Sequence, residues 1–438
     1  MVGSFGEPMT DAQKIRQLER QLAECDGISP VDGARQIDIL NDLAWALSDT
    51  DLQRAYAHAE TAYTLASSSD DGASPYQVGI AYSLRTQGYV NQRLGEYPLG
   101  MAQLLKAQGI FESLQINEGL PDVFDGIAGI YGQTGDFPEA LELAYKQLQA
   151  AQRIGDQRRV ANAYNNLAVI YYGIGEKHRA IETLHLNLQL AIELDYKRIE
   201  FLSCVNLAGI FLETGDYGEA LENAQRGLRI SQEANFELFE MHALDLIGSS
   251  YLKLGDLQLA IHFLEQALAS ARKMDAKVNE SVILLDIGEA YREMRQLDRA
   301  LDYFHQGMAI ARAVGDKPSL VRAHALLSEL YEQQGNAAQA LIHFKQHTSI
   351  KDVVFSEKAD KRLKVLQVTR DIETAKKEAE ILHRRPHHHD RTALPGAGRK
   401  PGGELPDAAG SRGGVVVRCG LPGDHVRLGR QPLHTHAV

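Results

Sequence analysis

Primary amides that lie close together in the middle of the chain are the side chains whose type and spacing suggest chemistry. Asn162, Asn165 and Asn166 form one group, and Asn206 follows Asn166 after forty residues. A primary amide both donates and accepts hydrogen bonds, so it complements the N–H and C=O groups of an extended peptide. These residues predict a site that binds a polypeptide main chain. The alternative is that Asn165 and Asn166 form hydrogen bonds between neighbouring helices of the protein itself.

Apolar and charged residues farther along the chain extend this candidate site. Tyr172, Leu212 and Leu252 are expected to form pockets for the side chains of a ligand. Charged residues follow, and they would favour a different part of the ligand unless they simply form a solvated surface. These charged residues are Arg292, Arg322, Glu289, Glu329 and Glu332.

Motifs of catalysis or cofactor binding do not occur in the sequence. It has no P-loop, no G-x-G-x-x-G after a strand and no H-E-x-x-H. Residues 387–390 (HHHD) contain suitable ligands for a transition metal, but consecutive residues in a flexible segment are not a preorganised site. The histidines elsewhere are expected at the surface or in packing between helices. We therefore expect a protein without enzymatic activity, metal or cofactor.

Charge and cysteine usage narrow the class of partner. The net charge is -12, and residues 384–438 hold nine Lys/Arg against four Asp/Glu, which leaves -17 on the preceding residues. An acidic body argues against nucleic acid as a partner. Three scattered cysteines without a C-x-x-C pair indicate a reducing compartment. Neither an export signal nor a long apolar stretch is found, so a cytoplasmic protein without a membrane segment is expected.

The elements that must position these residues form a repeat with a period of forty residues. Glycine marks the turn in most units, and a small residue stands seven positions before each turn. A fixed period in this range is typical of a solenoid, in which one helical hairpin stacks on the next. The turn column is Gly95, Gly135, Gly175, Gly215, Gly255, Arg295 and Gly335; the small column is Gly88, Ala128, Ala168, Ala208, Gly248, Gly288 and Ser328.

Each unit is predicted to be a helix, a tight turn and a second helix. Glycine ends the first helix because the left-handed conformation costs it nothing, and a following Asp is expected to cap the second helix. A less regular copy begins upstream, where Asn41 to Ala44 resemble Asn165 to Ala168, and residues 67–75 form a loop after it. These units fill residues 33–347 and predict eight hairpins.

The columns of small residue, aromatic residue, turn glycine and small residue resemble the tetratricopeptide repeat family in a lengthened form. The resemblance implies an all-α fold, a right-handed α-solenoid whose first helices line a concave groove. It also implies that a protein or peptide binds in this groove. The candidate binding residues above lie on such first helices.

The segments outside the array are expected to differ from it. Residues 1–32 are predicted to hold a short capping helix at 10–24, and residues 384–438 a disordered tail that suggests a frame-shifted gene. Residues 348–383 form an amphipathic connector with a heptad seam, which predicts a parallel homodimer or a single helix over the last hairpin. The seam consists of Val365, Val368, Ile372, Ala375, Ala379 and Leu382.

The connector also resembles the helix that follows the sensor repeats of bacterial signalling proteins with a diguanylate cyclase, nucleotide cyclase or kinase domain. This resemblance implies the sensor half of a signalling protein that binds a partner without catalysing a reaction. Three alternatives stay open: a complete peptide-responsive regulator, a structural scaffold, or the input region of a truncated cyclase.

Overall fold

The computed structural model describes residues 11–25, 33–68 and 74–384, and every regular element in these ranges is a helix. The chain divides into one unit of residues 1–373 with 434–438, and a second unit of residues 374–433. The second unit is described only where it forms the end of the last helix, through Arg384. All contacts reported below lie within the first unit.

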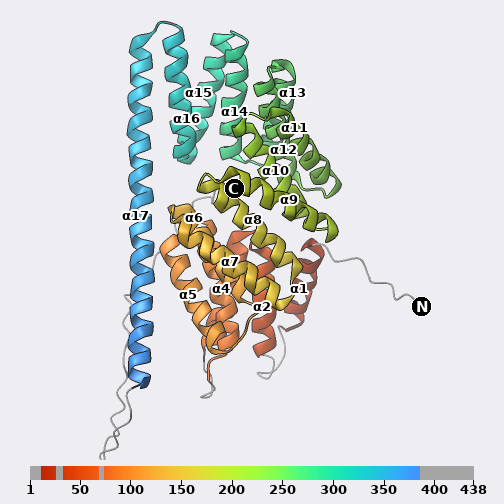
Figure 1. Cartoon of the computed structure of the whole chain (residues 1–438), viewed down its shortest axis with the longest axis vertical. Helices are drawn as coiled ribbons and strands as arrows, with labels where there is room; N and C mark the ends of the chain where they lie inside the picture. Colours follow the sequence, from red (N-terminus) through yellow and green to blue (C-terminus); the bar gives the residue numbers. More distant parts are fainter. Residues whose placement is uncertain (1–10, 26–32, 69–73, 385–438) are drawn as a thin grey trace, which may run out of the picture. The chain divides into compact units, whose positions relative to one another are not determined.

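Sixteen of the seventeen described helices pair into eight consecutive hairpins (Figure 1). Each helix packs on the next one in the chain up to α16, and a short helix, α1 (Asp11–Cys25), packs on α2. The hairpins are α2 (Gly33–Leu47) with α3 (Leu52–Ser67), α4 (Gln77–Arg93) with α5 (Tyr97–Ser113), α6 (Leu120–Thr134) with α7 (Phe137–Ile154), α8 (Gln157–Gly173) with α9 (Lys177–Glu193), α10 (Lys197–Thr214) with α11 (Tyr217–Glu233), α12 (Glu237–Leu254) with α13 (Leu257–Lys273), α14 (Lys277–Glu293) with α15 (Leu297–Val314), and α16 (Lys317–Gln333) with α17 (Ala337–Arg384).

The predicted fold class is thus confirmed as an all-α array of hairpins that ends in a long helix. The predicted disorder of residues 385–438 and the metal-ligand run within them lie outside the described residues. None of the helices in the described ranges is long and apolar enough to cross a membrane.

Two left-handed residues in each forty-residue period set the geometry of the array. One is the turn glycine within the hairpin, for example Gly215 with φ 90° and Gly255 with φ 86°. The other lies between hairpins, where two positions are glycine and the others are polar residues such as Asp195 (φ 47°) and Asn235 (φ 55°). Asn and Asp tolerate this conformation better than most residues, so the backbone keeps the left-handed conformation at these positions without glycine. The second column was only partly visible in the sequence.

The expected capping by the turn aspartates holds at some turns and is wrong at others. Asp256 accepts a hydrogen bond from the backbone N–H of Leu259, as expected for a cap. The carboxylate of Asp216 instead accepts a hydrogen bond from the Thr214 hydroxyl at 2.7 Å. The threonine hydroxyl, two residues earlier, is a local donor that competes with the helix N–H groups.

Small residues allow the two helices of a hairpin to approach each other closely. A Cβ atom added to Gly88 in α4 would lie 2.6 Å from Cγ of Leu104 and 3.0 Å from the carbonyl oxygen of Gly100 in α5. Large side chains then fill the interior on either side of this contact. Phe111, Phe201 and Phe304 are fully buried.

The last helix, α17, continues without a break from the final hairpin into the predicted connector. Val365 is fully buried against the array, and Val368 packs beside it. Thr369 lies 3.5 Å from the Tyr131 hydroxyl, and Arg362 pairs with Asp136. This part of α17 therefore lies against the third hairpin, and Lys361 over the Tyr97 ring adds a contact with the second.

The turn residue Arg295 has φ 61°, although its column otherwise holds glycine, and its side chain is exposed. We expect Arg295→Gly to raise the free energy of unfolding by up to about 1 kcal/mol, because the left-handed conformation costs an L-residue about 1–2 kcal/mol and the greater entropy of unfolded glycine offsets part of the gain. Urea denaturation followed by circular dichroism measures the change. Arg295→Ala keeps the strained backbone, so an equal gain in that variant would contradict this explanation.

Candidate functional site

The first helices of successive hairpins contact one another and form a continuous surface. Contacts join α2 to α4, α4 to α6, and so on to α14 and α16. We call the surface shared by these eight helices the inner face. Polar side chains pair between neighbouring first helices in two ways. A residue contacts either the residue 41 positions later in the chain or the residue 37 positions later. Examples are Asn165 with Asn206, and Arg85 with Asp122.

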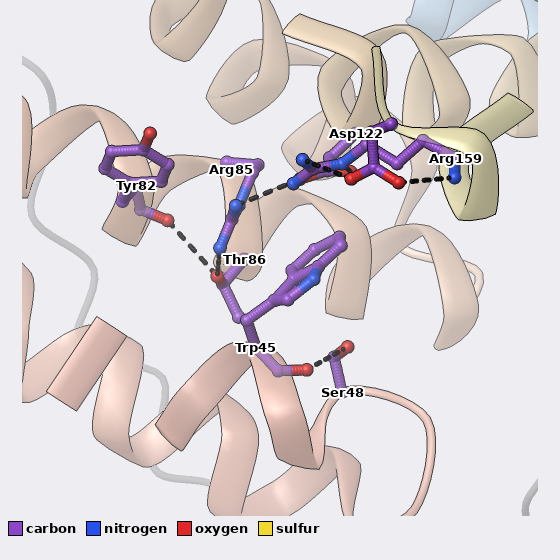
Figure 2. Close-up of polar contacts among 8 residues, drawn as sticks. Trp45, Ser48, Tyr82, Arg85, Thr86, Asp122 and Arg159 are labelled. Atoms are coloured by element: carbon purple, nitrogen blue, oxygen red, sulfur yellow. Dashed lines mark hydrogen bonds and ion pairs between the residues drawn. The ribbon is translucent and has the colours of Figure 1, made fainter. Parts of the chain in front are cut away.

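A buried ion-pair ladder joins three first helices near the start of the inner face (Figure 2). Asp122 in α6 accepts hydrogen bonds from Arg85 in α4 at 3.0 Å and from Arg159 in α8 at 2.9 Å. The Arg85 guanidinium also lies 4.0 Å from the centroid of the Trp45 ring and 4.9 Å from that of Tyr82. Arg85 and Asp122 are 4% and 7% exposed, so each charge depends on its partner.

A second ion pair connects the first hairpin to the fifth. Asp49, in the turn after α2, pairs with Arg198 of α10 and lies 3.7 Å from Arg93 of α4. The Tyr89 hydroxyl donates to the same carboxylate at 3.1 Å. Partial burial would raise the pKa of Asp49, but Arg198, Arg93 and Tyr89 outweigh it, and the pKa lies below its usual value. The first and fifth hairpins are therefore joined directly.

The predicted amide cluster lies at the centre of the inner face, and three of its four members bond between helices. Asn206 donates to the Asn165 side-chain oxygen at 3.1 Å. Asn166 donates to Asp125 and to Gln147, the latter at 2.9 Å. These contacts are those of the alternative interpretation, in which the asparagines join neighbouring helices.

The Asn165–Asn206 bond uses only half of each amide. The Asn165 nitrogen and the Asn206 oxygen have no hydrogen-bond partner among the described residues, and both side chains are partly exposed. Exchanging the two ends of both amides would still leave one donor and one acceptor free. Asn162 is also partly exposed and has no hydrogen-bond partner within the described ranges. The pair thus presents both functions that a peptide unit requires.

The other predicted binding residues are less uniform. Tyr172 is 37% exposed, and its hydroxyl donates to Glu213. Leu212 is partly exposed, whereas Leu252 is 9% exposed and packs in a core cluster. Arg292 is far along the array, where it pairs with Glu329 at 2.9 Å. Tyr172 and Leu212 remain available to a ligand, but Leu252 serves mainly in packing.

Two partly buried carboxylates on the inner face were not identified from the sequence. Burial raises the pKa of Asp125 to about 7, although the hydrogen bond from Asn166 opposes the shift. Burial and the nearby Asp286 raise the pKa of Asp245 to about 8, against the opposing charge of Arg322. A search of the sequence for polar residues 41 positions apart would have identified both carboxylates. Asp125 stands 41 residues before Asn166, and Asp245 stands 41 residues before Asp286.

Histidines near the end of the array pack between helices, as was expected for some of the histidines. The Nδ1 atoms of His324 and His343 lie 3.0 Å apart, and both side chains are buried. Burial lowers the pKa of His324 to about 4, and the neighbouring His343 adds to the shift. Within the described ranges, no group of three or more candidate metal ligands occurs.

Comparison with protein families identifies the repeat in the third and later hairpins. Residues 122–185, 201–273 and 280–352 match the family model of the tetratricopeptide repeat. These stretches are tetratricopeptide repeats. The family resemblance of the sequence is thereby confirmed for most of the array. A search of curated proteins gave no match.

Several solved structures share the fold of this helical array. The apo quorum sensor NprR from B. thuringiensis has a TM-score of 0.59 and 13% identity, over 78% of this chain and 94% of that chain. A Rap protein complexed with competence and sporulation factor has a TM-score of 0.53 and 15% identity, over 80% and 99%. The Rap conjugation gene regulator of plasmid pLS20, in complex with the Phr* peptide, has a TM-score of 0.52 and 14% identity, over 79% and 96%.

The partly buried acid Asp245 should make stability depend on pH. Its pKa is raised on folding, so the protonated form stabilises the native state, and this contribution is lost as the pH rises from about 4 to about 8. We expect thermal unfolding at pH 5 to 9 to show a fall of at most about 1.4 kcal/mol per pH unit from this group. Asp245→Asn should flatten the profile, and an unchanged slope in that variant would exclude Asp245 as its source.

The ladder around Asp122 should be sensitive to loss of its shared carboxylate. Asp122→Ala would leave the buried Arg85 and the nearby Arg159 without their common partner. We expect a loss of about 3–5 kcal/mol in unfolding free energy, measured by chemical denaturation. Asp302 is exposed in α15, so Asp302→Ala should change stability by less than about 0.5 kcal/mol. Similar effects of the two substitutions would refute the importance of the ladder.

Proposed function

We propose that the protein is a non-catalytic tetratricopeptide module that binds a peptide or an extended segment of a partner protein on its inner face. The observation that carries this proposal is the Asn165–Asn206 pair, which leaves one donor and one acceptor free. An extended peptide offers one acceptor and one donor at each peptide unit. Tyr172 and Leu212 would contact ligand side chains next to this pair.

The solved structures support the same class of ligand. A Rap protein is in complex with competence and sporulation factor, and another Rap protein with the Phr* peptide. We transfer from these proteins only the proposal that this chain binds a peptide in a signalling role. The acidic body and the sequence pattern favour a cytoplasmic bacterial protein without nucleic-acid or membrane partners.

The position of α17 favours a peptide-responsive regulator over a passive scaffold. Helix α6 carries Asp125, which bonds to the amide cluster, and Tyr131, which contacts Thr369 of α17. A ligand that moves α6 would therefore disturb the docking of α17. The input region of a truncated cyclase would use the same coupling, with the catalytic activity in a domain outside this chain.

Binding should depend on both amides of the central pair. A library of short unmodified peptides, screened by the fluorescence of the single tryptophan, Trp45, would identify a binding sequence, because Trp45 lies on the inner face beside Arg85. We expect the double substitution Asn165→Ala and Asn206→Ala to weaken that peptide roughly tenfold, since each lost hydrogen bond contributes about 0.5–1.5 kcal/mol. Isothermal titration calorimetry measures the affinity.

The matched control is Asn223→Ala, which removes a partly exposed amide on the second helix α11. This variant should bind the selected peptide as the unsubstituted protein does. Unchanged affinity after loss of Asn165 and Asn206 would overturn the assignment of this pair, and failure of every peptide in the library would favour the scaffold alternative.

A further inference from the structure

One face of α17 remains exposed although it carries large apolar side chains. Leu341 and Phe344 are 53% and 57% exposed, and Phe355, Leu363 and Leu366 are 76%, 64% and 42% exposed. Five such residues on one helix are more than the scattered apolar residues of an ordinary surface. This face is therefore a candidate contact surface.

The start of this face is the uncovered end of the array. Phe304 in α15 is fully buried, whereas Phe344, forty residues later at the same position of the repeat, is exposed. The difference arises because a following hairpin covers Phe304 and none follows Phe344 within the described residues. A terminal repeat needs a polar outer face or a covering partner.

The spacing of the face has an unusual symmetry. Successive members are 3, 4, 4, 3, 4, 4 and 3 residues apart, and this series reads the same in both directions. Steps of three and four keep residues on one side of a helix. All members are exposed, while His343 and Val365 are buried on another side of the helix. The members, which we call the exposed stripe, are Leu341, Phe344, Thr348, Asp352, Phe355, Ala359, Leu363 and Leu366.

We propose that a second copy of this chain binds to the exposed stripe with its own α17 running antiparallel. The symmetric spacing then places Leu341 opposite Leu366 of the second copy, and Phe344 opposite Leu363. Thr348 faces Ala359 between them, and Asp352 lies opposite Phe355 at the centre of the pair. This pairing uses a different face from the predicted parallel seam, whose Val365 is buried in the array.

Charge complementarity supports this register. Lys345 and Asp360 lie on the same edge of the exposed stripe, both are exposed, and neither has an ion-pair partner among the described residues. In an antiparallel pair with Leu341 opposite Leu366, Lys345 of each copy approaches Asp360 of the other. Residues on the same edge of two antiparallel helices face each other, so the contact forms twice.

Residues 385–438 of the chain itself are a poorer occupant. Their sequence contains no Phe, Tyr, Trp, Ile or Met, although interface cores are rich in aromatic residues and Met. The second copy supplies two Phe and three Leu residues. The chemistry of the exposed stripe therefore matches another exposed stripe better.

The size of the contact sets its strength. A stripe from Leu341 to Leu366 is about 38 Å long and about 10 Å wide, so it covers about 400 Å² per copy, half of a standard interface. We expect reversible pairing that depends on protein concentration. The inference does not depend on peptide binding.

Sedimentation velocity of the full chain over a range of micromolar concentrations tests the proposal. The unsubstituted protein should shift from monomer towards dimer, and the double substitution Phe344→Glu and Leu363→Glu should abolish the shift. Val353, 45% exposed on another side of α17, provides the matched control Val353→Glu. Circular dichroism verifies that each variant keeps its helices. A protein that stays monomeric, or a control that dissociates equally, would overturn the proposal.

Cross-linking tests the orientation. With the native cysteines replaced, a mixture of Phe344→Cys and Leu363→Cys proteins should form disulfide-linked heterodimers. Phe344→Cys alone should not link, because its two copies lie far apart in an antiparallel pair. Efficient linkage of Phe344→Cys to itself would instead indicate parallel helices and refute the arrangement.

Discussion

The forty-residue period is the constraint on which the rest of the structure depends. Two left-handed residues recur in each of six consecutive periods, one within the hairpin and one after it, from Gly95 to Gly315. A side chain on one first helix contacts residues 41 or 37 positions later on the next first helix. These two positions are four residues apart, which is roughly one helical turn, so they lie on the same side of that helix. The ladder through Asp122 and the amide pair Asn165–Asn206 both follow from this geometry.

Much of the fold could be predicted because its signals are local. Turn glycines, small residues and aromatic residues recur at fixed positions, and each reflects a backbone or packing requirement of a single hairpin. Polar residues in the second left-handed column, such as Asp195, were harder to recognise because their side chains have other uses in turns. The turn aspartates were partly misassigned, because a threonine hydroxyl two residues earlier competes for the carboxylate.

The candidate site could be placed on the correct helices, but its pairings could not be derived from composition. Asn166 contacts Asp125, and Arg85 contacts both Asp122 and Trp45, across helices whose relative shift is known only from the structure. The partner of helix α17 likewise could not be derived from the sequence. Its amphipathic pattern predicted a face to be covered, but the partner of Val365 proved to be the array itself, far away in sequence.

The pair of Asp49 with Arg198 changes how the array should gain and lose structure. In a simple solenoid each unit interacts only with its neighbours, so the array can open or fray one hairpin at a time. A contact between residues 149 positions apart closes a large loop, which forms late in folding because its entropic cost must be met before it contributes. The pair therefore couples the opening of the first hairpin to that of the fifth, which contacts between neighbouring units alone would leave separate.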